Sequence, residues 1–299
     1  MDLDTYIVTV FDRIDDTTRL VVASLDLGRL RQRGPQPILA DSEILTIETV
    51  GAYLGFTEEK TIYDYFRRHY AHFFPGLRRI DRSTFVRQVA NLWRLKEAVW
   101  QHLLEHEVPV PEYVIADSLP IEVCRFARAP RCKRFRGEAA FGWCWVNDHV
   151  FYGFRFHALV DPFGFIRCFV VTPANVDEKE ALEQMVDGKT GRVLGDRNYW
   201  SPAWMRWLLD RGVQVIAPFK HASRDPDRRW SAFLGRLRRR VETVFGQFTE
   251  RFKMKQVGAK DTWHFASRLL RSVLSHTLAL IVYRSSGGTD MQIANLLSA

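Results

Sequence analysis

The sequence predicts an α/β domain with a mixed, five-stranded sheet and flanking helices, preceded by an all-helical N-terminal domain. Apolar residues recur at helical spacing within residues 1–107. Pro109 and Pro111 then interrupt this pattern, and proline breaks a helix because it lacks an amide donor. Short β-rich runs follow and alternate with helical segments, which is the element order of an α/β sheet. We therefore predict a helical domain at 1–107 and a sheet domain at 108–299.

The composition is that of an ordinary soluble globular protein. The chain has 299 residues, 46% of them hydrophobic and 26% charged, which suits one large domain or two smaller ones. Its N-terminus is acidic from Asp2 and lacks the basic start of a secretory signal. The apolar stretch 268–284 is interrupted by Arg271 and His276 and is too short to span a membrane. These features predict a cytoplasmic protein with a buried late helix and no membrane partner.

The cysteines argue against a structural zinc site. The chain has four of them and no Cys-x-x-Cys pair, whereas structural zinc usually takes two close ligand pairs. Unpaired core thiols are the simpler interpretation.

Three segments of the first domain have helical patterns. The stretch 40–56 has an Asp-Ser start and a glycine near its end. The stretch 57–74 follows after a break at Gly55, and 81–107 predicts a long amphipathic helix. Two short helices joined around a glycine are compatible with a DNA-binding helix-turn-helix, and equally with a structural three-helix bundle.

The second domain alternates strands and helices. β-Rich or alternating runs predict five strands, and capping residues begin the helices between them. The expected strands are 113–117, 149–161, 165–175, 192–196 and 213–219, with helices at 177–186 and 201–212 and around Glu242.

Positive charge is concentrated in two segments. Residues 221–260 contain eleven Lys or Arg and four Asp or Glu, a surplus of seven against a net charge of +8 for the chain. The stretch 124–136 carries six positive side chains and no acid. Such clusters favour a polyanion, first nucleic acid and second an acidic membrane surface, although a solvated surface is the plain alternative. The membrane option is weaker because the helix in the later segment uses its apolar side for packing.

Three carboxylates are expected to converge. Asp117 and Asp196 each end a short apolar strand, and ligand-binding groups of open α/β sheets lie beyond such ends. Glu242 lies at the edge of the buried stripe of its helix, about 100° round from Val241. Converging carboxylates repel one another unless cations lie between them. A pair of Mg²⁺ ions, which favour oxygen ligands, would resolve this and could support in-line phosphoryl displacement.

Each acid also has a structural explanation. Asp117 could cap the loop that follows it, and Asp196 could hold a turn or pair with Arg197. Glu242 could be a solvated surface group on a basic helix. Their joint placement beside the basic helix favours a functional site.

An ordered set of motifs carries a family resemblance. The stretches "VIADS", "FYGFRFH", "VTPANVDE", "VLGDRNYWSP" and "LRRRVETVFGQF" resemble the DDE transposases of bacterial insertion sequences, most closely insertion-sequence family 982. The resemblance implies a ribonuclease-H-like catalytic domain and DNA strand cleavage and joining with two Mg²⁺ or Mn²⁺ ions. It also implies that Asp117, Asp196 and Glu242 are the catalytic, metal-binding triad.

The basic side chains are candidates for DNA binding. Arg238 precedes Glu242 by one helical turn, so it could reach a DNA phosphate or instead pair with Glu242. In related families a tyrosine and a lysine flank this pair, where the chain has Gly235 and Thr249. Lys253 or Lys255 could replace that lysine. The DNA-binding candidates are Arg238, Arg239, Arg240, Lys253, Lys255, Arg134 and Arg136.

Three further residues are candidates for a supporting role. His157 and Asn175 lie in motifs that resemble the family, although a strand histidine paired with a neighbour is as good an explanation. Tyr199 follows Asn198, where related families often have glycine, and it could stack on an unpaired base. Core packing is the alternative for the neighbouring Trp200.

The sequence thus predicts a transposase that binds terminal inverted repeats and target DNA. Two ends must be joined, so we expect a homodimer in the DNA complex, associated with the bacterial nucleoid. The helical domain is expected to recognise the ends. The rivals are a metal-dependent nuclease that does not join strands and a DNA-binding relative without catalysis. A glycosidase with paired carboxylates would leave the basic segments unexplained.

Overall fold

The chain folds into two compact units. The computed structural model describes residues 1–24, 36–144, 148–255 and 257–297. A helical unit consists of Met1–Pro109, Arg251–Lys253 and Gly258–Ala299, and a sheet unit consists of Val110–Glu250 and Met254–Val257. The last part of the chain was expected in the sheet domain, within 108–299, but it packs with the N-terminal helices instead. The reason is the apolar surface of its helix, described next.

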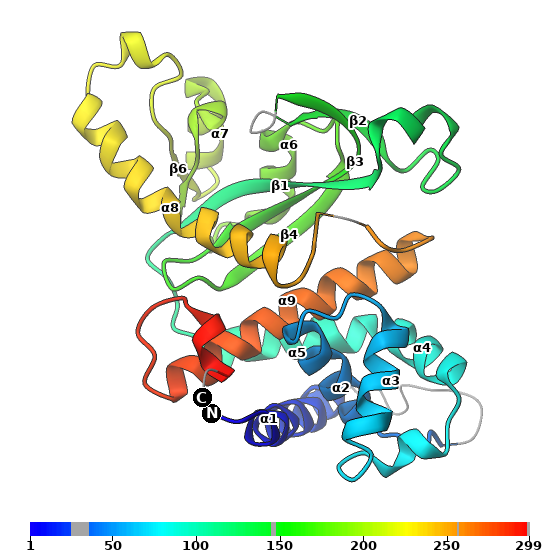
Figure 1. Cartoon of the computed structure of the whole chain (residues 1–299). Coiled ribbons are helices and arrows are strands. Elements are labelled where there is room, and N and C mark those ends of the chain that lie inside the picture. The colour runs from blue at the N-terminus through cyan, green and yellow to red at the C-terminus, as the bar shows by residue number, and fades with distance from the viewer. Residues whose placement is uncertain (25–35, 145–147, 256, 298–299) are drawn as a thin grey trace. The chain divides into compact units, whose positions relative to one another are not determined.

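The helical unit is built around α9 (Thr262–Ser285), which packs against α2 (Asp41–Tyr53) and α5 (Trp93–His106) (Figure 1). Among the described helices, α9 is the one long and apolar enough to cross a membrane, and 89% of that apolar window is buried. This confirms the expected buried helix. The remaining helices of the unit are α1 (Leu3–Ser24), α3 (Glu59–His69), α4 (Arg82–Asn91) and the short 3₁₀ turns Pro75–Arg78 and Ile293–Leu297.

Two expectations for these helices change. The long helix expected over 81–107 is divided at Leu92, between α4 and α5. The first helix of the possible helix-turn-helix, α2, is buried at 11 of its 13 positions. A helix enclosed on all sides is a core helix, so α2 has no face free for DNA.

A buried ion pair ties three helices of this unit together. Lys96 Nζ of α5 lies 2.7 Å from Glu48 Oε1 of α2. It also donates to Ser267 Oγ of α9 at 2.8 Å. Both charged side chains are almost fully buried, at 0% and 1% exposure. Such a pair holds a defined helix arrangement, because breaking it leaves an uncompensated charge in the core.

The sheet unit contains a six-stranded mixed sheet within the described residues. In space the main order is β4-β3-β1-β5-β6, with β1 antiparallel to β3, β3 antiparallel to β4, and β1, β5 and β6 parallel. This is the arrangement of a ribonuclease-H-like fold, so the predicted fold class is confirmed. The strands are β1 (Val114–Cys124), β2 (Ala140–Cys144), β3 (His149–Val160), β4 (Ile166–Pro173), β5 (Arg192–Leu194) and β6 (Gln214–Ile216).

The sheet has one strand more than the five expected. The additional strand, β2, pairs with residues 149–153 of β3, on the edge that β4 continues from residue 154. A side chain at Gly142 would collide with the carbonyl oxygen of Ala174, so only glycine fits where the two strands meet. A five-residue strand that contains glycine gives little periodic signal.

Helices cover both faces of the sheet. Along β1, side chains alternate between the faces, so Asp117 and Ser118 point to opposite sides. The helix α8 (Arg228–Glu250) covers the face of Asp117, where its Phe248 packs 6.1 Å from Phe156 between ring centres (Figure 1). The other face packs against α6 (Glu178–Met185) and α7 (Pro202–Leu209), around a core that includes Leu182, Val193, Tyr199 and Leu208.

Replacing Lys96 by methionine should lower the free energy of unfolding of the helical unit by about 3–5 kcal/mol, because Glu48 would stay buried without a partner. The double variant Lys96→Met/Glu48→Leu should recover most of this loss. Arg19→Met is the matched control, because Arg19 pairs with Asp15 while 73% exposed, and it should change stability by less than about 1 kcal/mol. Urea unfolding measures all three; a loss below 1 kcal/mol for Lys96→Met would contradict the prediction.

Candidate active site

One pocket of the sheet unit is lined by all three predicted acids. It has a volume of about 640 Å³, and Asp117, Asp196 and Glu242 contribute to its wall. Asp117 and Asp196 come together because β1 and β5 are parallel neighbours with Ile115 opposite Leu194. Each aspartate lies two residues beyond that paired position, so both occur at the same level of the sheet. Glu242 comes from α8 and is exposed to solvent at the pocket.

Asp117 is the acid most affected by its surroundings. Its pKa is raised to about 6, mainly by burial, and the negative charges of Glu178 and Asp196 contribute to the rise. Arg238 and the Ser118 backbone amide, which donates to Oδ1 at 2.8 Å, act in the opposite direction. The carboxyl group therefore gains and loses its proton near neutral pH, which is common at functional sites.

Arg238 pairs with Asp117 and not with Glu242. Its Nη2 lies 3.2 Å from Asp117 Oδ2, so the contact joins α8 to β1. The intrahelical ion pair weighed in the sequence analysis is therefore wrong. Glu242 forms no ion pair within the described residues. The guanidinium neutralises the buried aspartate and leaves the helix glutamate free.

Asp196 also holds a local turn. Its Oδ1 accepts the backbone amide of Asn198 at 2.8 Å, and its Oδ2 accepts the side-chain amide of the same residue at 3.2 Å. Arg197 does not pair with Asp196 and donates to the carbonyl of Phe219 at 2.6 Å. Asp196 therefore holds a turn, as the structural explanation predicted. The same contacts with Asn198 fix its carboxylate at the pocket wall.

Three more acids line this pocket, Glu122, Glu178 and Glu250, and none was a candidate in the sequence. Among them, Glu178 contacts the side chain that follows Asp117. It lines the same pocket from the first turn of α6. Its Oε1 accepts from Ser118 Oγ at 2.8 Å and lies 3.6 Å from Nη1 of Arg155. The motif "VTPANVDE" ends on this residue, and that was the available signal. Glu178 and Arg155 were overlooked because neither follows a predicted strand end.

The three residues predicted to support the site lie in different environments. Tyr199 is only 1% exposed and packs in the core beside Gly195, so the prediction that it stacks on a base is wrong. Its hydroxyl is buried, and no hydrogen-bond partner lies among the described residues. Burial and the charges of Glu178, Asp117 and Asp196 raise the pKa of Tyr199 well above its usual value. It stays neutral beneath the acids.

His157 belongs to the sheet interior. It is fully buried, and its Nε2 lies 2.9 Å from Thr172 Oγ1. Burial lowers its pKa to about 4, and the nearby Arg155 contributes to this. The histidine is therefore neutral at physiological pH and does not line the acidic pocket. This agrees with the alternative explanation, a strand histidine that pairs with a neighbour.

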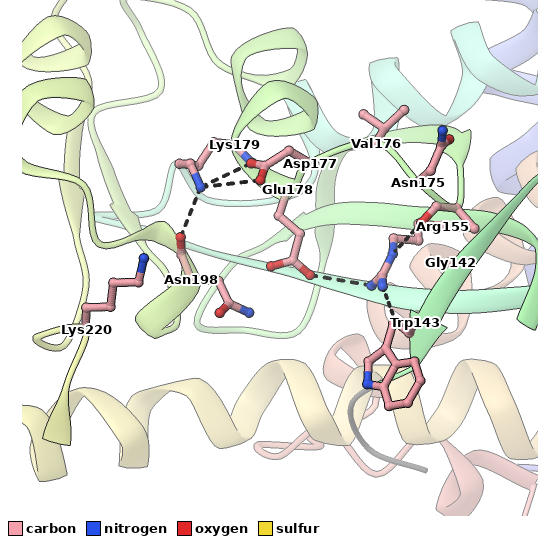
Figure 2. Close-up of a pocket in the computed structure, with 11 residues that line it drawn as sticks. Gly142, Trp143, Arg155, Asn175, Val176, Asp177, Glu178, Lys179, Asn198 and Lys220 are labelled. Atoms are coloured by element: carbon pink, nitrogen blue, oxygen red, sulfur yellow. Dashed lines mark hydrogen bonds and ion pairs between the residues drawn. The ribbon is translucent and has the colours of Figure 1, made fainter. Parts of the chain in front are cut away.

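Asn175 lines a neighbouring pocket of about 420 Å³, together with Arg155, Lys179 and Lys220 (Figure 2). Arg155 connects the two pockets, because it contacts Glu178 and Ser118 on one side and donates to the carbonyl of Ala174 at 3.2 Å on the other. Figure 2 also shows Lys179 between Asp177 and the carbonyl of Asn198.

The other DNA-binding candidates lie at different distances from the acids. Lys255 lines the acidic pocket, whereas Lys253 belongs to the helical unit. Arg239 and Arg136 are exposed, Arg240 is half-buried, and Arg134 is exposed while one of its amino groups donates to the carbonyl of Val123 at 2.6 Å. Of the two lysines considered as replacements at Thr249, the structure brings only Lys255 to the pocket among the residues it describes.

The acidic pocket has the donor atoms that a hard divalent cation prefers. Carboxylate oxygens are typical ligands of Mg²⁺, so the residues fit such an ion by chemistry. Over the described ranges, however, no group of three His, Cys, Asp or Glu side chains is arranged to hold a metal ion. Asp117 is engaged by Arg238 and Asp196 by Asn198. Each carboxylate keeps lone pairs that these contacts do not use.

The sheet unit resembles a known protein family. Residues 110–258 match the family model of the transposase DDE domain. The matched segment includes β1, β5 and α8, and with them all three acids. The match supports a DDE transposase. No curated protein matches the chain in sequence.

One solved structure resembles the whole chain loosely. It is the cryo-EM structure of the piggyBac transposase synaptic complex with hairpin DNA, with 11% sequence identity and a TM-score of 0.48. The similarity covers 99% of this chain and 79% of that chain. A similarity at this level does not bear on function.

The raised pKa of Asp117 gives a pH-dependent stability. An acid whose pKa is higher in the folded state stabilises the fold below its unfolded pKa, near 4, and this contribution is lost as pH rises through about 6. Between pH 4 and 7 the wild-type protein should therefore lose about 3 kcal/mol relative to Asp117→Asn, which cannot ionise. Urea unfolding of both proteins across this range tests it. Parallel pH profiles would show that Asp117 titrates normally.

Proposed function

We propose that the chain is the DNA transposase of an insertion sequence and that Asp117, Asp196 and Glu242 are its catalytic triad. The observation that carries this proposal is the shared pocket: three acids far apart in the sequence line one cavity inside the segment that matches the transposase DDE domain. The finer resemblance to family 982 remains a prediction.

The three carboxylates would hold two Mg²⁺ or Mn²⁺ ions. When bound, these ions supply the Lewis acidity that an in-line phosphoryl displacement requires. Asp117 lies in β1, and Asp196 lies in the turn just beyond the end of the parallel neighbour β5, which suits a pair of fixed ligands. Glu242 forms no ion pair within the described residues and is exposed on α8, so it would complete the set from this helix.

The basic groups at the pocket would hold DNA. Arg238 pairs with Asp117 at the pocket, and its guanidinium would bind a phosphate beside the scissile bond when a cation takes its place at the carboxylate. Lys255 lies at the same pocket and would contact the backbone further along. Such contacts provide affinity and register, and they carry little sequence information. The substrates are the terminal inverted repeats and target DNA, and a homodimer would hold two ends together.

Strand transfer tests the triad. Labelled DNA carrying the element's ends is incubated with a supercoiled target and Mg²⁺ or Mn²⁺, and joined products are measured. Loss of one electrostatic stabiliser at a reacting centre costs about 10²–10³ in rate, so Glu242→Gln should lower joining by at least this factor while DNA binding is retained. Glu180→Gln, an exposed acid of α6 outside the pocket, is the matched control and should act as wild type.

Glu178→Gln discriminates between Glu178 and Glu242, two of the four glutamates that line the pocket with the aspartates. If Glu178→Gln abolishes activity and Glu242→Gln does not, Glu178 and not Glu242 is the third member of the triad. Full activity of both variants would show that neither glutamate binds a catalytic ion. Cleavage without joining by the wild-type protein would make it a nuclease of the same fold. DNA binding without either reaction would make it a non-catalytic relative.

The Arg238–Asp117 contact predicts how the site takes up ions. Arg238→Gln frees the Asp117 carboxylate and removes a positive charge, so it should strengthen Mn²⁺ binding without DNA by roughly tenfold, equivalent to about 1.4 kcal/mol. Electron paramagnetic resonance of free Mn²⁺ measures this directly. Arg239→Gln, the exposed neighbour, controls for net charge. Equal Mn²⁺ affinity in both variants would rule out competition between Arg238 and the ion.

A further inference from the structure

The outer face of α4 is a basic surface with a hollow beside it. Arg82, Ser83, Arg87 and Asn91 are all exposed, and their spacing places them along one side of the helix. Together with Trp263 and His264 from the start of α9 they line a hollow of about 600 Å³. All of these residues belong to the helical unit.

The charge around this face is one-sided. Residues 78–94 contain five arginines and a single acid, Asp81, and no acid lines the hollow. Arg82 and Arg87 form no ion pair or hydrogen bond within the described part of the chain. Uncompensated, exposed guanidinium groups on one helix face complement a polyanion.

The inner face of α4 is firmly anchored. Phe85 and Val89 are buried at 0% and 2% exposure. Gln88 donates to the carbonyl of Leu39 and to the Asp41 carboxylate, both at 3.1 Å. Ser267 Oγ of α9 donates to the carbonyl of Val89 at 3.2 Å. The helix therefore presents its outer side chains on a rigid support, which lowers the entropic cost of binding.

An aromatic group borders the same hollow. The Trp263 side chain is 48% exposed, and its ring packs 5.7 Å from that of Trp93 in an edge-to-face arrangement. Arg94 lies over the Trp93 ring at 5.3 Å. Asp261, the acid nearest in sequence, accepts the His264 amide at 2.9 Å as the cap of α9. Its carboxylate is thus engaged with the first turn of α9 and forms no ion pair with an arginine within the described residues.

The neighbouring helices are poorer candidates. The helix α2 is enclosed in the core. The exposed positions of α3 mix Arg67 and Arg68 with Asp64, so its charges partly cancel. Only α4 among these helices combines exposed arginines with the short polar side chains Ser83 and Asn91, which are suited to hydrogen bonds with base edges.

We propose that the outer face of α4 binds duplex DNA in the major groove and recognises the ends of the element. An α-helix fits this groove, arginines contact phosphates or guanine, and asparagine pairs with adenine. Arg82 and Arg87 supply affinity, Ser83 and Asn91 supply base contacts, and Trp263 packs against the backbone at the rim. The inference rests on the proposed function, because it names where the transposase holds its substrate.

Fluorescence anisotropy of the full-length protein tests this inference. Binding to a labelled duplex of about 40 base pairs, taken from the DNA that flanks the gene, is measured in EDTA at several NaCl concentrations. Arg82→Gln/Arg87→Gln should weaken binding at least tenfold and lower the slope of log affinity against log salt by about two. Arg68→Gln on α3 is the matched control and should change affinity less than twofold. Asn91→Ala should reduce the preference over a scrambled duplex.

The outcomes separate this inference from the proposed function. Unchanged binding and thermal unfolding in the double variant would overturn the role of α4. An equal loss with Arg68→Gln would overturn it too, in favour of α3 or diffuse attraction. Because EDTA removes the need for ions, Glu242→Gln should bind DNA as wild type does. If binding depends on α4 but the protein does not cleave DNA, the role of α4 stands and the transposase proposal is rejected. If the protein cleaves DNA but binding does not depend on α4, the transposase proposal stands and the role of α4 is rejected.

Discussion

The balance of charge at one end of the sheet is the constraint on which the candidate site depends. Parallel pairing of β1 and β5 forces Asp117 and Asp196 to the same level. Burial and the neighbouring charges of Glu178 and Asp196 all disfavour the ionised form of Asp117. Arg238 offsets this repulsion from α8, and Arg155 does the same for Glu178 from β3. The aromatic contacts that hold α8 to the sheet therefore also hold the counter-charge in place. The cation that offsets the charge of Asp117 thus comes from a helix and not from the sheet.

Local patterns predicted most of the elements. Alternation revealed the long strands, helical spacing revealed α2 and α3, and apolar composition revealed α9, because these patterns are properties of neighbouring residues. The short strand β2 was missed since its pairing depends on β3 and on the absence of a side chain at Gly142. The division between the units could not be predicted either. Periodicity indicated that α9 is buried, but it carries no information on which helices bury it.

The same distinction applies to the candidate site. Asp117 and Asp196 could be selected from the sequence, because both follow short apolar strands and parallel strands end together. The partner of Arg238 could not, because helical spacing offers Glu242 and only the packing of α8 on β1 brings Asp117 within 3.2 Å. Glu178 was hidden for a related reason: it lies at the start of a helix, and its link to Ser118 exists only across the sheet. Residues that act through long-range contacts need the fold before they can be identified.

The division of the helical unit has a consequence for how the protein is made. Residues 1–109 and 258–299 share one core, and the whole sheet unit is inserted between them. During translation the sheet unit is complete in the growing chain before α9 leaves the ribosome. The helices that precede the sheet unit must wait for α9, with the surfaces of α2 and α5 that pack on it uncovered. A ribosome that stops early would release a chain with an assembled acidic pocket and no finished helical unit, which is a natural target for proteolysis.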